Sequence, residues 1–246
     1  NKKGTATQYS EEEYFKTMKS AWFMNELVEK NIAIMDKYDP EGKVDLIVDE
    51  WGGWYEVEPG TNPGFLYQQN TMRDAMIAGM TLNIFNNHAR RVKMANLAQA
   101  VNVLQAVILT EGKSMILTPT YHVMEMYKVH QDAKLIPLTL QSTDLEFNNE
   151  KIPAVSVSAS QDTQGRTHIS LVNIDPKKKN KVQVDLGALK ASKVTGRILT
   201  SDNLRDYNSF KIPAKITPVV YKDAKLVNGA VEVEIPAFSV IVLELI

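Results

Sequence analysis

The stretch Leu46-Ile47-Val48-Asp49-Glu50-Trp51-Gly52-Gly53-Trp54-Tyr55 decides how the first part of this chain is interpreted. It lies at the end of the apolar run 44–48, which suits a short strand buried on both faces of a parallel sheet. The run ends abruptly in two acids and two tryptophans. In a barrel of alternating strands and helices, the carboxyl ends of the strands face the active site. The stretch therefore predicts a strand that carries functional side chains at its end.

Three pairs of residues make up that strand end. Side chains alternate along a strand, so we expect only one of the neighbouring acids Asp49 and Glu50 to face a site. Trp51 and Trp54 offer flat apolar surfaces that suit stacking against a sugar. Gly52-Gly53 matches no phosphate-binding pattern and is expected to let the backbone bend tightly. Taken alone, these residues leave open whether Glu50 is catalytic or structural, and neighbouring tryptophans are often core residues.

Helices and strands alternate on either side of this stretch. Ser10 with Glu13, and Thr71 with Asp74, form two capping boxes that mark helix starts. The first helix is expected to end near Pro40, because the residue before a proline disfavours helix. The predicted elements are a helix over 10–38, a strand over 44–48, a helix from 71 to about 86, a strand over 92–95 and a helix over 120–130. This order is typical of a parallel α/β fold.

The first part of the chain is expected to be incomplete by itself. Two strands neither make a stable sheet nor close a barrel. The chain begins Asn1-Lys2-Lys3-Gly4, with neither an initiator Met nor a signal peptide. We therefore expect a piece of a longer protein, and the compartment stays open.

The composition changes near residue 140, from helical and Met-rich to Val-rich and alternating. Turn residues such as Gly165 and Asn228-Gly229 separate the short apolar runs. Short strands at regular spacing indicate a β-sandwich or jelly roll. The predicted strands are Ala154–Ser160, His168–Asn173, Lys181–Asp185, Lys193–Leu199, Ala230–Ile235 and Ser239–Leu245.

Charge and composition exclude several classes of function. The 246 residues carry a formal net charge of −1, which argues against nucleic-acid or anionic-membrane partners. The absence of cysteine removes disulfides and thiolate metal sites. The pair Arg90-Arg91 is interpreted as a charged loop before the second strand. His88, His122, His130 and His168 show no metal-ligand spacing, so they are predicted to be structural or surface residues and no cofactor is implied.

Five segments in this order resemble glycoside hydrolase family 51, the α-L-arabinofuranosidases, and the resemblance covers essentially the whole chain. They are residues 49–55, Tyr67–Ala75, His88–Val103, Pro119–His122 and Ile235–Leu243.

The resemblance implies a fold and a set of site residues. Residues 1–134 would be the last portion of a TIM (β/α)8 barrel, with its seventh strand at Lys43–Asp49 and its eighth at Val92–Asn96. Residues 135–246 would be a C-terminal β-sandwich of jelly-roll type. By the same resemblance Glu50 is the catalytic nucleophile, Trp54 lines the sugar subsite and Gln99 binds the hydroxyls of the arabinose ring. Asn102 lies in the same motif, and we expect at most loop support from it.

The resemblance also implies a retaining mechanism that releases terminal α-L-arabinofuranosyl residues from arabinan or arabinoxylan oligosaccharides. Such a mechanism needs two carboxyl groups about 5–5.5 Å apart. The acid/base is expected in an Asn-Glu pair before Asn1. The pairs Asn25-Glu26 and Asn149-Glu150 are interpreted as solvated surface. We therefore expect this chain alone to be inactive, with the N-terminal half, an arabinose-containing saccharide and further copies of the intact protein as its partners.

Two other functions stay open at this stage. Another retaining barrel glycosidase, such as a β-xylosidase or β-glucanase, would also end this strand in a nucleophilic Glu. A non-catalytic carbohydrate-binding protein would use the sandwich, but the sandwich contains no tryptophan to serve as a platform.

Overall fold

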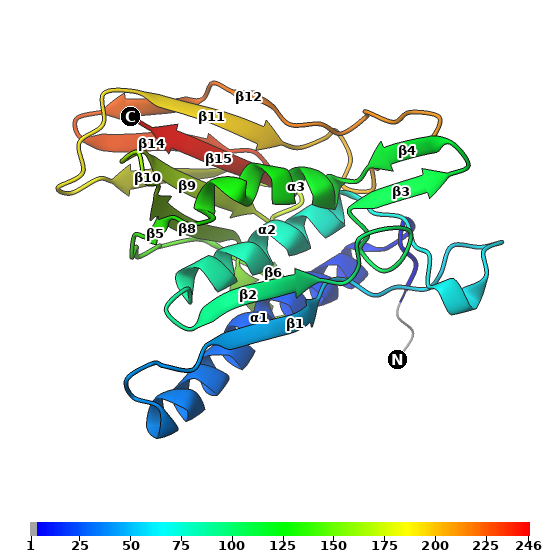
Figure 1. Cartoon of the computed structure of the whole chain (residues 1–246). Coiled ribbons are helices and arrows are strands. Elements are labelled where there is room, and N and C mark those ends of the chain that lie inside the picture. Colours follow the sequence, from blue (N-terminus) through cyan, green and yellow to red (C-terminus); the bar gives the residue numbers. More distant parts are fainter. Residues whose placement is uncertain (1–3) are drawn as a thin grey trace.

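A computed structural model describes residues 4–246, so the first three residues of the predicted first domain lie outside it. The chain is rich in β-structure. Figure 1 shows a β-sandwich at one end, two helices packed against its larger sheet, and a third helix beside a parallel pair of strands at the other end. The first helix, α1, spans Glu11–Tyr38 and begins with the predicted capping box of Ser10 and Glu13. It ends at Tyr38, and its C-cap Asp39 directly precedes Pro40, as predicted.

The parallel pair consists of β1 (Leu46–Trp51) and β2 (Val92–Leu97), joined through α2 (Met72–Asn87). One face of β1, which carries Leu46 and Val48, packs against the apolar core formed with the helices. On the other face Ile47 is 50% exposed, and on β2 Met94 is 53% exposed. The prediction of a strand buried on both faces is therefore wrong for residues 4–246, because no third strand and no helix of this range covers that second face.

Helix α2 lies at the centre of the molecule. Its capping box of Thr71 and Asp74 is present as predicted, and every residue from 72 to 81 is buried. A helix that is buried all round must pack on several neighbours. At Gly79 the helix approaches the sandwich so closely that an added Cβ would lie 2.7 Å from Cγ2 of Val172. Because residue 79 is a glycine, α2 can pack directly against the strand that carries Val172.

The sandwich contains two antiparallel sheets with an apolar core between them. The first sheet has the strand order β12-β11-β15-β9-β8-β5, and the second has the order β10-β14-β13. All six strands predicted for this part are present, and each of their ends lies within one residue of the prediction. The bounds are β5 Lys134–Leu135, β8 Val155–Gln161, β9 Thr167–Asn173, β10 Asn180–Asp185, β11 Val194–Leu199, β12 Val219–Tyr221, β13 Ala224–Val227, β14 Ala230–Ile235 and β15 Ser239–Leu245.

Two hairpins and several short elements were not predicted. In the hairpin β6–β7, Asn148 and Asn149 both take positive φ angles, which is the turn conformation that matches twisted strands. In β3–β4 the turn contains Gly112 with φ +56°. The predicted third helix is α3 followed by a short 3-10 turn. The bounds are β3 Ile108–Glu111, β4 Ser114–Leu117, β6 Asp144–Phe147, β7 Glu150–Pro153, α3 Pro119–Tyr127, η1 Pro63–Phe65 and η2 Lys128–His130.

Hydrogen bonds, and not only apolar contacts, join the helices to the six-stranded sheet. Asn83 of α2 donates to Oγ of Ser156 at 3.2 Å and accepts from Oγ of Ser158 at 2.8 Å. Tyr127 of α3 donates to the same Asn83 side chain at 3.0 Å. Such bonds require one relative position of helix and sheet, because a shift would leave buried polar groups unpaired. None of the helices within residues 4–246 has the length and apolar character needed to cross a membrane.

The pair Arg90-Arg91 divides into two different environments. Arg90 is exposed, as expected for a charged loop. The side chain of Arg91 is fully buried and lies 2.7 Å from carboxylate oxygens of both Asp36 and Asp39. It ties the end of α1 to the start of β2. The charged-loop interpretation is therefore wrong for Arg91, because folding brings two acids from α1 and its cap onto it.

Candidate active site at the carboxyl ends of the parallel strands

An irregularity in β1 sets the direction of its two acids. Val48 pairs with Ala95 and Trp51 pairs with Leu97, so Asp49 and Glu50 together lie opposite one residue of β2. Such a β-bulge disrupts the alternation of side chains. Val48 and Trp51 both contact the apolar core, whereas both acids are exposed. The bulge adds a residue between two inward-facing positions and leaves both acids exposed, and the expectation that only one of them faces a site stays a prediction.

The glycine pair after Glu50 makes the predicted tight turn. Gly52 has φ +135°, and a Cβ there would lie 3.0 Å from Oε1 of Gln105. The N–H of Gly53 donates to that same Gln105 oxygen, and the Gly53 carbonyl accepts from Nε2 of Gln68 at 3.0 Å. Two buried glutamine amides thus hold the two peptide units on either side of the Gly53 Cα.

Neither glutamine stood out in the sequence as a site residue. Gln68 and Gln105 are both fully buried. Besides Gly53, Gln68 accepts from the N–H of Tyr55 at 2.8 Å, and Gln105 donates to the carbonyl of Asp74 at 3.1 Å. No sequence spacing or residue type predicts this role. Each glutamine can hydrogen-bond to the turn only after folding has brought the two segments together.

The two tryptophans of the motif lie in opposite environments. Trp51 is 4% exposed, and its ring meets that of Phe85 edge to face, with 5.8 Å between centroids. Its predicted role as a stacking surface for sugar is wrong, because the bulge turns it into the core. Trp54 is 51% exposed, three residues further along. Of the two, Trp54 alone presents a surface that a ligand can reach.

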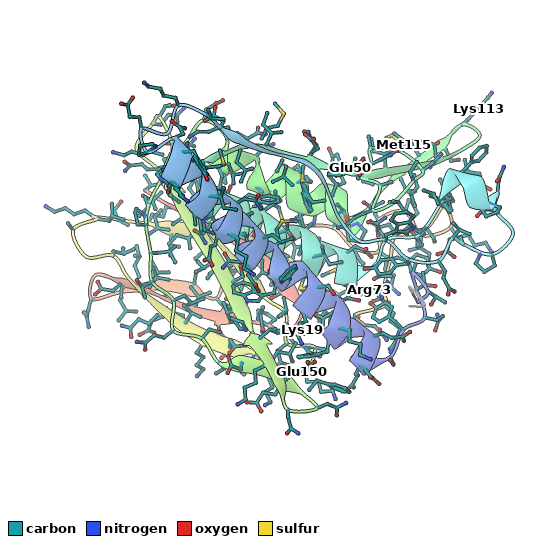
Figure 2. All side chains as sticks on the ribbon, turned by 90° about the horizontal axis from the view of Figure 1, so that it is seen from below. Lys19, Glu50, Arg73, Lys113, Met115 and Glu150 are labelled. Carbon is teal, nitrogen blue, oxygen red and sulfur yellow. The ribbon has the colours of Figure 1, made fainter. Side chains whose placement is uncertain are left out.

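Gln99 follows the end of β2 and is exposed. The loop that carries it is tied to the end of β1, since the N–H of Ala98 donates to the carbonyl of Trp51 at 3.0 Å. The Ala98–Gln99 peptide bond is cis. The structure therefore brings Glu50, Trp54 and Gln99 to the same end of the parallel pair. In Figure 2, Glu50 lies near the top of the view, well away from the ion pair of Lys19 with Glu150 near the bottom.

The guanidinium of Arg73 packs against the rings of Tyr55 and Tyr9 beside this turn. The guanidinium of Arg73 lies 3.6 Å from the ring centroid of Tyr55 and 3.9 Å from that of Tyr9. Arg73 is buried and donates to the carbonyls of Thr5 and Ala6 (Figure 2). Burial raises the pKa of the neighbouring Asp74 to about 6, against the opposing effect of Arg73. These contacts join the turn, α2 and the N-terminal segment into one unit.

A hollow of about 650 Å³ lies between α1 and this turn, and it is bordered by Trp51, Trp54 and Arg73. Within residues 4–246, two buried donors at its border, Nε1 of Trp51 and Nε of Arg73, have no hydrogen-bond partner. Neither here nor anywhere else in residues 4–246 do three or more histidine and acidic side chains form a group that could hold a metal ion.

Comparisons with known proteins show which family the chain belongs to. The family described as Alpha-L-arabinofuranosidase C-terminal domain matches residues 49–239. The chain belongs to this C-terminal domain family of the GH51 α-L-arabinofuranosidases. Over 244 residues it is 46% identical to the intracellular exo-alpha-L-arabinofuranosidase of Bacteroides ovatus, covering 99% of this chain and 48% of that protein.

Solved structures show the same relationship. The GH51 arabinofuranosidase of Xanthomonas axonopodis pv. citri matches with a TM-score of 0.97 and 45% identity, covering all of this chain and 50% of that one. The arabinose complex of the Thermotoga maritima α-L-arabinofuranosidase has a TM-score of 0.78 at 24% identity, over 94% of this chain and 49% of that one, and shows the shared fold. The chain thus spans about half the length of the relatives that it matches.

Proposed function

We propose that the complete protein containing this chain is a retaining glycoside hydrolase that releases terminal α-L-arabinofuranosyl residues from arabinan or arabinoxylan oligosaccharides. One observation carries the proposal. The exposed carboxylate of Glu50 lies at the carboxyl end of a parallel strand, with Trp54 and Gln99 at the same end. This arrangement occurs in a chain that is 46% identical to an exo-α-L-arabinofuranosidase.

In this proposal β1 and β2 are the last two strands of a (β/α)8 barrel. Residues 1–134 form the barrel portion and residues 135–246 the sandwich domain. The exposed Ile47 and Met94 then face the barrel interior and are covered by strands of the N-terminal half. The same half supplies acceptors for the unpaired donors of Trp51 and Arg73 at the 650 Å³ hollow. Assembly of the complete protein into a homo-oligomer is a further prediction, which a measurement of its mass in solution tests.

The reaction is a double displacement. A carboxylate oxygen of Glu50 bonds to the anomeric carbon while the bond from that carbon to the leaving oxygen breaks. An acid from the N-terminal half, about 5–5.5 Å from Glu50, protonates the leaving oxygen and then takes a proton from the attacking water. Water replaces Glu50 at the anomeric carbon and the sugar leaves. The roles of this chain are to hold Glu50, to line the sugar ring with Trp54 and to bind its hydroxyls with Gln99.

The test uses the complete protein and a 2-fluoro-arabinofuranosyl inactivator, followed by peptide mass mapping. We expect one covalent adduct, on Glu50. The variant Glu50→Gln should lose hydrolysis by at least about 10³-fold. The matched control Asp45→Asn, which changes an exposed acid before the same strand, should keep it. An adduct on another residue would overturn the assignment of Glu50. Faster hydrolysis of aryl xylopyranosides than of aryl arabinofuranosides would overturn the assignment of α-L-arabinofuranosides as the substrate.

A further inference from the structure

Asp74, in the first turn of α2, has a buried carboxylate with a hydrogen-bond partner on only one of its two oxygens. Oδ2 accepts from the backbone N–H of Thr71 at 2.8 Å, as the capping box requires. Oδ1 has no hydrogen-bond partner within residues 4–246, although Asp74 is 0% exposed. A charged oxygen that is buried without a partner is costly, so we expect a donor close by.

The hydroxyl of Tyr55 is a second buried group without a partner in the same range. Its oxygen lies against the turn after Glu50, since a Cβ added to Gly53 would be 2.8 Å from it. The guanidinium of Arg73 lies 3.6 Å from the centroid of the Tyr55 ring and fixes that ring in place. Burial, and next the charge of Asp74, raise the pKa of Tyr55 well above its usual value. The hydroxyl therefore keeps its proton and remains a donor.

The surroundings of Asp74 favour Tyr55 as that donor. The unpaired Nε of Arg73 borders the 650 Å³ hollow, whereas Asp74 does not border it and is enclosed by its own chain. The titratable groups that act on the carboxylate from the elements around it are Arg73 on α2, Tyr9 on the N-terminal segment and Tyr55 on the turn. The hydroxyl of Tyr9 already donates to the carbonyl of Leu204 at 2.8 Å.

We propose that Asp74 is a positioning residue for the reaction: its free carboxylate oxygen accepts a hydrogen bond from the Tyr55 hydroxyl and so fixes the turn after Glu50. This inference rests on the proposed function. Asp74 then acts on the turn through two groups. Its backbone carbonyl accepts from Gln105, which holds the N–H of Gly53, and its carboxylate holds the tyrosine that lies against the same glycine.

The proposal predicts a dependence of kcat on pH. Burial raises the pKa of Asp74 to about 6, against the opposing effect of Arg73. The carboxylate is therefore mostly ionised at pH 7 and mostly protonated at pH 5. An ionised acceptor makes a hydrogen bond roughly twice as strong as a neutral one. The hold on Tyr55 should weaken as the pH falls through about 6.

The experiment measures kcat and KM of the complete protein on an aryl arabinofuranoside for Asp74→Asn, Tyr55→Phe and the double variant. Asn keeps an oxygen that can cap Thr71, and Phe keeps the ring that packs on Arg73. At pH 7 each single variant should lose about tenfold in kcat with little change in KM. The double variant should be no slower than either, because both changes remove the same hydrogen bond. At pH 5 the loss in Asp74→Asn should shrink to about twofold, since the wild type is then mostly protonated.

Tyr14→Phe is the matched control. Tyr14 is also buried, but its hydroxyl donates to the carbonyl of Ile174, in the sandwich, at 2.7 Å. This variant should lower the melting temperature and leave kcat at its wild-type value.

Three outcomes would contradict the proposal in different ways. Additive losses in the double variant would overturn the pairing and leave Asp74 to another donor, such as the unpaired Nδ2 of Asn70. Wild-type kcat in either single variant, or a loss in Asp74→Asn that is the same at pH 5 and pH 7, would overturn the positioning role. A wild-type protein that leaves the substrate intact would overturn the proposed function. The melting temperatures of the same four proteins would then still test the pairing, because paired groups give non-additive shifts.

Discussion

The side-chain oxygen of Gln105 accepts a hydrogen bond from the backbone N–H of Gly53, three residues beyond Glu50. The amide nitrogen of the same side chain donates to the carbonyl of Asp74, in the first turn of α2. One buried side chain thus links the turn after the proposed nucleophile to the central helix. The position of the turn depends on a residue that shares no sequence motif with it.

Replacing Gln105 by Leu tests this link. The N–H of Gly53 and the carbonyl of Asp74 would each lose a partner, so the free energy of unfolding should fall by about 1–3 kcal/mol. In the complete protein kcat on an aryl arabinofuranoside should fall at least about tenfold, with a smaller change in KM, because misplacement of the reacting groups affects the transition state most. The exposed Gln164→Leu serves as the control. A folded Gln105→Leu protein with wild-type kcat would show that Gln105 does not position the turn.

The neighbouring arginines provide a matched pair for stability. In Arg91→Leu, two aspartates and the carbonyl of Val44 lose a fully buried partner. The melting temperature should fall by roughly 5 °C or more, because removal of one partner leaves the other charges uncompensated. Arg90 is 59% exposed in its ion pair with Asp36, so Arg90→Leu should shift the melting temperature by at most about 2 °C. Equal shifts would contradict a special role for Arg91.

His130 predicts a dependence of stability on pH. Its two ring nitrogens lie 2.7 Å from Oγ of Ser160 and 2.5 Å from Oγ of Ser170, between α3 and the sheet. Burial, and next the charge of His168, lower its pKa to about 4. An unfolded histidine has a pKa of about 6.5. Between these values the unfolded chain binds more protons, so this histidine costs stability as the pH falls from about 6.5 to 4.

The measurement is the free energy of unfolding of the wild type and of His130→Asn at pH 7, 5 and 4. The advantage of the wild type should shrink by about 2–3 kcal/mol over this range. The other titrating groups, including the buried Asp74, are present in both proteins and largely cancel. A difference between the two proteins that stays constant with pH would show that His130 titrates normally in the fold.

Local signals in the sequence predicted much of the secondary structure. Both capping boxes are present, because a cap is a contact between residues three apart and needs no tertiary context. The six predicted strands of the sandwich exist because alternation of apolar residues reports one buried face. The hairpin β6–β7 was not predicted, since its turn uses two asparagines with positive φ in place of a glycine.

The sequence by itself determined the ends of the two helices with capping boxes and of six sandwich strands to within about a residue, which family the chain belongs to, and where the candidate site residues Glu50, Trp54 and Gln99 occur. These follow from local contacts and from residue order. Only the tertiary structure decided that Asp49 and Glu50 are both exposed, that Trp51 lies in the core, and that Gln68 and Gln105 hold the turn. Each of these depends on pairing between segments far apart in the chain, and the physical forces that select such pairings, burial and hydrogen-bond satisfaction, act only once the segments meet.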